Sequence, residues 1–278
     1  MPMRRSLGFL LTLCLLLSLS PVFGQESAGY VVENTHYWLA RPIALRANAQ
    51  SAVGFPYGWH RNHQSPIHHG VDMVNPRGTP VLAAADGIIY YAGNDFERVF
   101  GEKPNFYGNL IIMQHALEAP EGGAVFTLYG HLYRIDVEVG QHVAQGEVIG
   151  AVGATGIALG SHLHFEVRVG NAEDYFATRN PELWYAPLDG TGTLIGRLLN
   201  ADGSPALGVR LTLSAPTRAP YTFTYSDPNL RSDPDFNENF TLADLPAGCY
   251  RLRARGTPLD VPICLKAGET VFIEATLP

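Results

Sequence analysis

Short apolar stretches recur along the chain between turns rich in Gly, Asn and Pro, and no segment keeps a helical period. In the first two-thirds of the sequence, runs of β-branched and aromatic residues occupy positions 80–84, 87–92, 109–115, 124–132, 147–152 and 162–169. Runs of this length, bounded by turn residues, are typical of strands. The pattern predicts an all-β fold.

The sequence changes character near residues 187–193. All ten histidines precede this linker-like stretch, whereas Cys249 and Cys264 follow it. Further strands are expected at residues 194–199, 210–214, 239–242, 249–255 and 270–276. We therefore predict an N-terminal arm over residues 25–53, a first β domain over residues 54–187 and a small β-sandwich over residues 193–278.

The first residues have the form of an export signal. Arg4 and Arg5 precede an apolar run over residues 7–19, and small residues up to Gly24 suit cleavage before Gln25. The run is shorter than the roughly 20 residues that a membrane-spanning helix needs. Residues 1–24 are thus predicted to be a signal peptide, with a retained anchor as the alternative. The mature chain would be secreted or periplasmic in a bacterium, without a transmembrane span.

Charge and cysteine content fit export. Without Arg4 and Arg5 the chain keeps 17 of its 19 basic side chains against 26 acidic ones. This balance argues against nucleic acid or an anionic membrane as a partner. Cys249 and Cys264 form an even pair in an oxidising compartment, so a disulfide between them is one expectation that sequence leaves open.

The histidines suggest a metal site. On a strand, His162 and His164 point to one face, roughly 6–7 Å apart. On straight extended chain, His68 and Asp72 would lie about 13 Å apart, so we expect a bend at Gly70, where no Cβ blocks the approach. Two imidazoles and a carboxylate, with a fourth position open to water, are a suitable catalytic zinc set.

A series of motifs then resembles one family in family order. The motifs are Phe55-Pro56-Tyr57-Gly58, His68-x-Gly70-Val71-Asp72, Pro76-x-Gly78-Thr79-Pro80-Val81, Ala84-Ala85-Asp86-Gly87, Tyr107-Gly108-Asn109, Leu128-Tyr129-Gly130-His131-Leu132, Val137-x-x-Gly140-x-x-Val143-x-x-Gly146 and Gly153-x-Thr155-Gly156, followed by Gly160-Ser161-His162-Leu163-His164-Phe165-Glu166. Together they resemble lysostaphin-type (LytM-like) zinc metalloendopeptidases over about residues 54–170.

The resemblance implies a role for each histidine of the motifs. His68, Asp72 and His164 correspond to the family's Zn²⁺ ligands, and His131 and His162 to its catalytic, non-ligand histidines. The implied reaction is hydrolysis of peptide bonds in peptidoglycan cross-links or bridges by a zinc-activated water. Which of His131 and His162 removes the proton stays open.

Two other functions remain as alternatives. A non-catalytic wall-binding or hydrolase-activating module would be expected to lack a ligand, and here every position is filled. A zinc peptidase acting on an extracellular protein would keep the same site.

The other polar residues receive structural interpretations. Glu166 shares the face of His162 and His164 and is expected either to orient an imidazole or to have a packing or surface role. His69 is expected beside the site or on the surface, and His115 and His142 in structural or solvated positions. His60 and His63 are candidates for the rim of the cleft. His36 is expected at the surface or in packing, with an autoinhibitory arm that reaches the zinc as the alternative.

The C-terminal segment resembles carboxypeptidase-regulatory-like β-sandwich modules. The likeness lies in residues 196–205 and 240–250, with Asn239 where the pattern usually has Gly. It implies a spacer or a domain that binds wall or protein. The acidic loop over residues 227–238 is expected to be solvated, with Ca²⁺ binding as the alternative.

Overall fold

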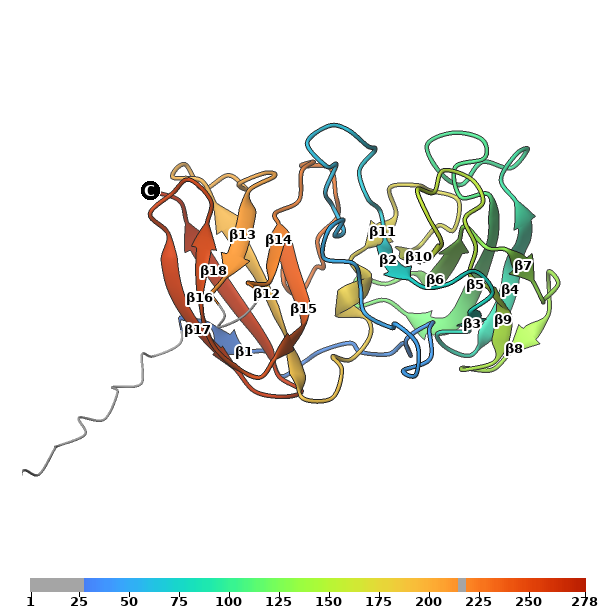
Figure 1. Cartoon of the computed structure of the whole chain (residues 1–278), viewed down its shortest axis with the longest axis horizontal. Helices are drawn as coiled ribbons and strands as arrows, with labels where there is room; N and C mark the ends of the chain where they lie inside the picture. The colour runs from blue at the N-terminus through green and yellow to red at the C-terminus, as the bar shows by residue number, and fades with distance from the viewer. Residues whose placement is uncertain (1–27, 215–218) are drawn as a thin grey trace, which may run out of the picture.

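The computed structural model describes residues 28–214 and 219–278, so the expected signal peptide lies outside the described residues. Two β lobes lie side by side in it (Figure 1). The only helix among the described residues is the short 3₁₀ helix η1 (Pro181–Leu183). In the described part of the chain, no helix has the length and apolar character to cross a membrane. The predicted all-β fold is confirmed.

The first lobe is built on one large antiparallel sheet. Its strands run in the order β11 (Thr178–Arg179), β10 (His162–Val169), β6 (Ala124–Gly130), β5 (Asn109–Glu118), β4 (Gly87–Asn94) and β8 (His142–Val143), and β2 (Val71–Val74) also pairs with β10. A small sheet of β3 (Pro80–Leu82), β9 (Val148–Ala151) and β7 (Arg134–Ile135) completes the lobe. The predicted strands of this half are all present, with ends shifted by a few residues.

The second lobe is a sandwich of two four-stranded sheets. One sheet contains β1 (Tyr30–Val31), β18 (Thr270–Thr276), β12 (Thr191–Leu199) and β15 (Phe240–Pro246). The other contains β14 (Tyr221–Phe223), β13 (Arg210–Leu213), β16 (Gly248–Ala254) and β17 (Asp260–Leu265). Leucines of β12, β13 and β16 meet in its core. Sequence patterns did not predict β1, β14 or β17.

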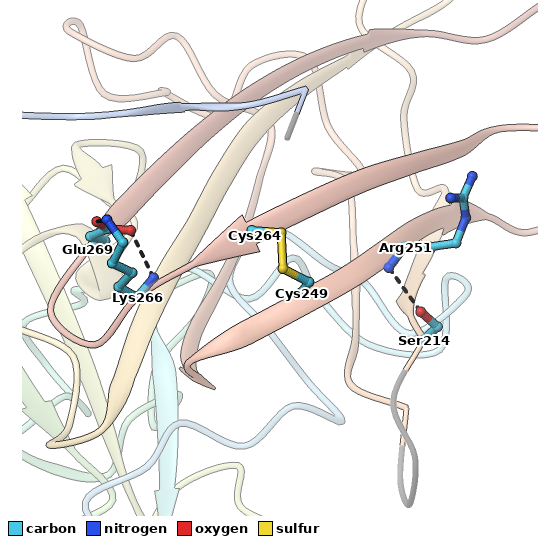
Figure 2. The surroundings of a disulfide bond; sticks show 6 residues. All are labelled: Ser214, Cys249, Arg251, Cys264, Lys266 and Glu269. Atoms are coloured by element: carbon cyan, nitrogen blue, oxygen red, sulfur yellow. Dashed lines mark hydrogen bonds and ion pairs between the residues drawn. A yellow bond between two sulfur atoms is a disulfide. The ribbon is translucent and has the colours of Figure 1, made fainter. Parts of the chain in front are cut away.

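A disulfide joins Cys249 to Cys264 (Figure 2). The two cysteines lie directly opposite each other on the antiparallel strands β16 and β17. The bond therefore ties together the two strands at one edge of the sandwich.

The N-terminal arm crosses from one lobe to the other. Its strand β1 pairs with β18 of the second lobe, which Figure 1 shows as a blue strand among red ones. Farther along, Leu39 and Ile43 are buried in the core of the first lobe. Trp38 packs edge-on against Trp184, with ring centroids 5.6 Å apart. The arm thus contacts both lobes.

Aromatic and polar contacts join the lobes close to the expected active site. Trp59 stacks on Phe223 of β14, with centroids 3.9 Å apart. The carbonyl of Gly58 accepts the N–H of Ser226, while the N–H of Gly58 donates to the carbonyl of His68. The second lobe therefore supports the loop that precedes His68.

A cluster of charges lies where the arm, η1 and β15 meet. The Arg41 guanidinium donates to Asp244 at 2.6 Å. Burial and the neighbouring Asp244 carboxylate raise the pKa of Glu182 to about 7, against the opposing effects of Ser51 and Arg41. Glu182 is thus expected to keep its proton in the folded protein at mildly acidic pH.

Candidate active site

Strand pairing brings three potential metal ligands together. Asp72 of β2 lies directly opposite His164 of β10. The Asp72 Oδ1 atom is 3.1 Å from His68 Nε2 and 3.0 Å from His164 Nδ1, and the two nitrogens are 3.2 Å apart. In a tetrahedral zinc site with bonds of roughly 2.0–2.1 Å, neighbouring ligand atoms lie about 3.3 Å apart. The three donor atoms, Asp72 Oδ1, His68 Nε2 and His164 Nδ1, therefore form a triangle of nearly the size that a zinc site needs.

Gly70 makes this approach possible. A Cβ at this position would lie 2.4 Å from the carbonyl oxygen of Phe165 and 2.9 Å from the His164 ring. The chain therefore passes β10 more closely than any residue with a side chain allows. This is the close approach that sequence analysis expected at Gly70.

Hydrogen bonds fix which ring nitrogen each ligand imidazole offers. The Nδ1–H of His68 donates to the carbonyl of Phe55 at 2.7 Å, so its Nε2 lone pair points into the triangle. The Nε2–H of His164 donates to Glu166 Oε1 at 3.0 Å, so its Nδ1 lone pair does the same. Metal-bound imidazoles in proteins almost always have such an outer acceptor. The donor set therefore fits Zn²⁺.

A buried ion pair lies behind His164. Glu166 and Arg168 are both fully buried, with Arg168 Nε donating to Glu166 Oε2 at 2.7 Å. The Tyr107 hydroxyl donates to Glu166 Oε1 at 2.5 Å. Burial alone would raise the pKa of Glu166, but Arg168 and His164 lower it to about 2. Glu166 is therefore ionised and accepts the hydrogen bond that orients the His164 imidazole, which is one of the interpretations that the sequence offered.

The Asp72 carboxylate is ionised for a similar reason. Burial alone would raise its pKa, but the imidazoles of His68 and His164 hold the pKa well below the usual range of an aspartate. A ligand carboxylate must be deprotonated to bind a metal ion.

The two remaining expected site histidines face the triangle without joining it. His131 follows β6, and its ring centroid lies 5.7 Å from that of His164 and 4.8 Å from that of His162. Its Nδ1–H donates to Thr155 O at 2.8 Å, and that of His162 donates to Gly160 O at 2.9 Å. Carbonyls accept only, so each neutral ring keeps a lone pair on Nε2, and that of His162 lies 3.5 Å from Asp72 Oδ1.

His131 has a left-handed backbone, with φ of 61°. This conformation is costly for a residue with a side chain and persists where its surroundings enforce it. The enforcing contacts are its N–H bond to Tyr107 O and its ring bond to Thr155 O. These two hydrogen bonds hold the His131 ring at the site in spite of the unfavourable backbone conformation.

The site opens into a groove of about 550 Å³. Its lining includes Phe55, Arg61 and Pro66 of the segment before His68, together with Ile157 and Leu159. Arg61 lies over the Phe55 ring, 5.1 Å from its centroid, and has no carboxylate within ion-pair distance among the described residues. Arg61 therefore places a positive charge in the lining of the groove.

The other histidines are not part of the triangle, although His69 lines the same groove, beside the site as one expectation had it. His69 is buried, with its Nδ1 2.9 Å from the Thr178 hydroxyl, and it is not at the surface. His115 is buried in a structural position, and His142 is exposed. His60 contacts His63 in a loop, and neither lines the groove. His36 pairs with Asp233 of the second lobe.

Two residues behind the site were not assigned a role from sequence. Arg168 follows His164 and Glu166 at the same two-residue spacing on β10, so strand alternation could have suggested its place. Tyr107 belongs to a family motif, but its contact with Glu166 spans 59 residues of sequence and carries no local signal.

The first lobe is similar in sequence to known proteins. Residues 66–175 match the model of Peptidase family M23. DD-carboxypeptidase/endopeptidase Mpg of Neisseria meningitidis is 34% identical over 148 residues, which are 52% of this chain and 28% of the relative. Peptidoglycan DD-endopeptidase ShyC of Vibrio cholerae is 36% identical over 106 residues, 38% of this chain and 21% of the relative.

A solved structure is also similar. The catalytic domain of lysostaphin from Staphylococcus simulans is 27% identical, with a TM-score of 0.36, over 48% of this chain and 96% of that domain. The chain spans less than a third of the length of the two curated relatives. The match over residues 66–175, which contain all five expected site residues, shows that this protein contains a domain of peptidase family M23.

Proposed function

We propose that this protein is an exported zinc metalloendopeptidase that hydrolyses peptide bonds in peptidoglycan. The observation that carries the proposal is the convergence of His68, Asp72 and His164 within 3.0–3.2 Å at the floor of a groove. The name of ShyC supports a peptide of peptidoglycan as the substrate, and the name of Mpg supports a peptidase. The predicted signal peptide supports a location in the bacterial envelope or outside it.

The three side chains would hold Zn²⁺ through His68 Nε2, Asp72 Oδ1 and His164 Nδ1. Bound zinc supplies a water of lowered pKa and a positive charge that polarises the scissile carbonyl. The protein contributes orientation, since Phe55 O and Glu166 fix the two imidazole tautomers. The groove would hold the substrate as an extended chain, with a carboxylate of the peptide near Arg61.

We assign the proton transfers to His131 and His162. Each ring has its Nδ1–H bound to a carbonyl and a lone pair on Nε2, so each can take a proton and later return it to the leaving amine. A protonated ring would also donate a hydrogen bond to the developing oxyanion. The geometry of the two rings is alike in these respects, so both are given acid–base roles.

Variants of these histidines test the assignment. We expect His131→Ala and His162→Ala each to keep zinc but to lose at least ~100-fold in turnover, the usual scale for a positioned acid–base group. His164→Ala should lose both zinc and activity. The measurements are metal content by mass spectrometry and release of soluble fragments from purified peptidoglycan. Loss of zinc from either of the first two variants would contradict their placement outside the ligand set.

The sandwich over residues 193–278 is proposed to be a carboxypeptidase-regulatory-like module without chemistry of its own. Its contacts support a structural contribution, because Ser226 and Phe223 hold the loop that carries Gly58 and Trp59. A wall or protein ligand of this lobe is a further part of the proposal. Retention of the isolated mature protein on purified cell wall, compared with a chain lacking the lobe, would measure it.

A further inference from the structure

A second cluster of metal-ligating side chains lies away from the groove. It joins His36 of the N-terminal arm to Asp233 and Asp235 of the loop before β15. One donor atom of each residue lies within 4.8 Å of the others. His36 and Asp233 are 3% and 1% exposed, while Asp235 lies at the surface.

The contact between His36 and Asp233 lies at ion-pair distance but does not have the alignment of a hydrogen bond. His36 Nε2 lies 2.9 Å from Asp233 Oδ2. Both atoms are buried, and neither has a correctly aligned hydrogen-bond partner among the described residues. The two buried groups lie at ion-pair distance from each other, but no aligned hydrogen bond offsets their desolvation. Two ligand atoms that share a metal ion lie at about this distance without pointing at each other.

The surroundings fix the orientation of both side chains. Asp233 Oδ1 accepts the backbone N–H of Asp235 at 3.0 Å, so that its Oδ2 is turned towards His36. The Asp233 N–H donates to Glu238 at 2.9 Å, which holds the backbone of the loop. The imidazole is packed against Trp184 and stacked on Phe236, with centroids 4.8 and 5.8 Å away. The two donors are therefore preorganised.

We propose that His36, Asp233 and Asp235 form a second, structural site for a divalent transition metal, Zn²⁺ in particular. One imidazole nitrogen and two carboxylate oxygens are donors that suit Zn²⁺, whereas Ca²⁺ takes six to eight oxygens. The exposed side at Asp235 leaves a position for water. The ion would join the arm to the second lobe, and the site is independent of the proposed peptidase activity.

Metal stoichiometry tests the proposal. Metal-free mature protein, with its disulfide intact, is dialysed against Zn²⁺ and analysed by inductively coupled plasma mass spectrometry. The wild type should bind two equivalents, and His36→Ala and His164→Ala one each. With Co²⁺ as the probe, His164→Ala should still give tetrahedral absorption bands, and a double His36→Ala/His164→Ala variant should lose them.

A second variant, Asp235→Asn, tests the same site if His36→Ala fails to fold. Asp235 is exposed, so Asp235→Asn should fold and lower Zn²⁺ affinity at the second site at least tenfold. Asp189→Asn, at an exposed position in the linker, is the matched control and should bind two equivalents. Added Zn²⁺ should also raise the unfolding temperature of His164→Ala. One equivalent in the wild type, or a second equivalent that persists in both His36→Ala and Asp235→Asn, would overturn the proposal.

Discussion

Replacing Glu166 with Gln should weaken zinc binding through a residue that does not touch the metal. The carboxylate accepts from three donors, namely His164 and Tyr107 at Oε1 and Arg168 at Oε2. An amide has one accepting oxygen and one donating nitrogen, so in either orientation its NH₂ group faces another donor. A buried donor without an acceptor is costly, and no rotation of the side chain avoids it.

The expected losses of zinc affinity and of stability follow from these contacts. Loss of an outer acceptor of a metal-bound imidazole typically lowers metal affinity 10–100-fold, equivalent to about 1.4–2.7 kcal/mol. The Arg168 charge also loses its buried partner, which should lower the free energy of unfolding of the metal-free protein by about 3 kcal/mol. Zinc affinity is measured by competition with a chromogenic chelator, and stability by urea unfolding.

A matched control separates the site from the general effect of removing a carboxylate. Glu173→Gln breaks a surface pair with Arg98, in which the side chains are 44% and 42% exposed. Such pairs contribute little, so zinc affinity and stability should stay close to wild type. If folded Glu166→Gln bound zinc within twofold of the wild type, the outer-acceptor role of Glu166 would be refuted.

Three further predictions concern other parts of the molecule. Gly70→Ala should abolish zinc binding and activity, because its Cβ would collide with Phe165 O at 2.4 Å; zinc content and turnover are the measurements. Glu182→Gln should remove a pH dependence of the free energy of unfolding. The Glu182 carboxyl loses its proton near pH 4.5 in the unfolded chain and near pH 7 in the folded protein. The free energy of unfolding of the wild type should therefore fall by about 1–3 kcal/mol as the pH rises through that window. The variant's urea midpoint should change less over the same range. Replacing both Cys249 and Cys264 with Ser should lower the free energy of unfolding by about 3 kcal/mol, by the chain-entropy model for their separation of 15, with zinc content unchanged.

Each of these has an outcome that would contradict it. Gly160→Ala is the control for Gly70→Ala, since a Cβ there meets no atom within 4 Å, and equal zinc content in both variants would show that the close approach is unimportant. Parallel pH profiles of wild type and Glu182→Gln would mean that Glu182 ionises normally. An unchanged urea midpoint for the cysteine double variant would show that the disulfide does not stabilise the sandwich.

The sequence was most informative where the contacts are local. Runs of β-branched and aromatic residues between turns predicted the strands of the large sheet, and strands such as β6 and β10 are buried along almost their whole length. The bend at Gly70 and the shared face of His162 and His164 followed from strand geometry alone. The structure adds that Asp72 lies opposite His164, a register that local pattern does not specify.

Long-range pairing could not be predicted in the same way. Strand β1 has two exposed residues, Tyr30 and Val31, and belongs to the second lobe only through its pairing with β18. Nothing near these residues in the sequence indicates a partner some 240 positions away. The burial of Arg168 was equally hidden, because its charge is compensated by Glu166 and by carbonyls that only the fold brings close.

Digestion of purified peptidoglycan by the mature, zinc-loaded protein tests the central claim most directly. Fragments are analysed by mass spectrometry with and without chelator, beside His164→Ala. We predict new peptide termini that require both the metal and His164, without new glycan ends. An intact peptidoglycan after treatment with protein shown to hold zinc in this site would contradict the proposed substrate, and a folded wild-type protein unable to bind zinc at all would contradict the proposed enzyme.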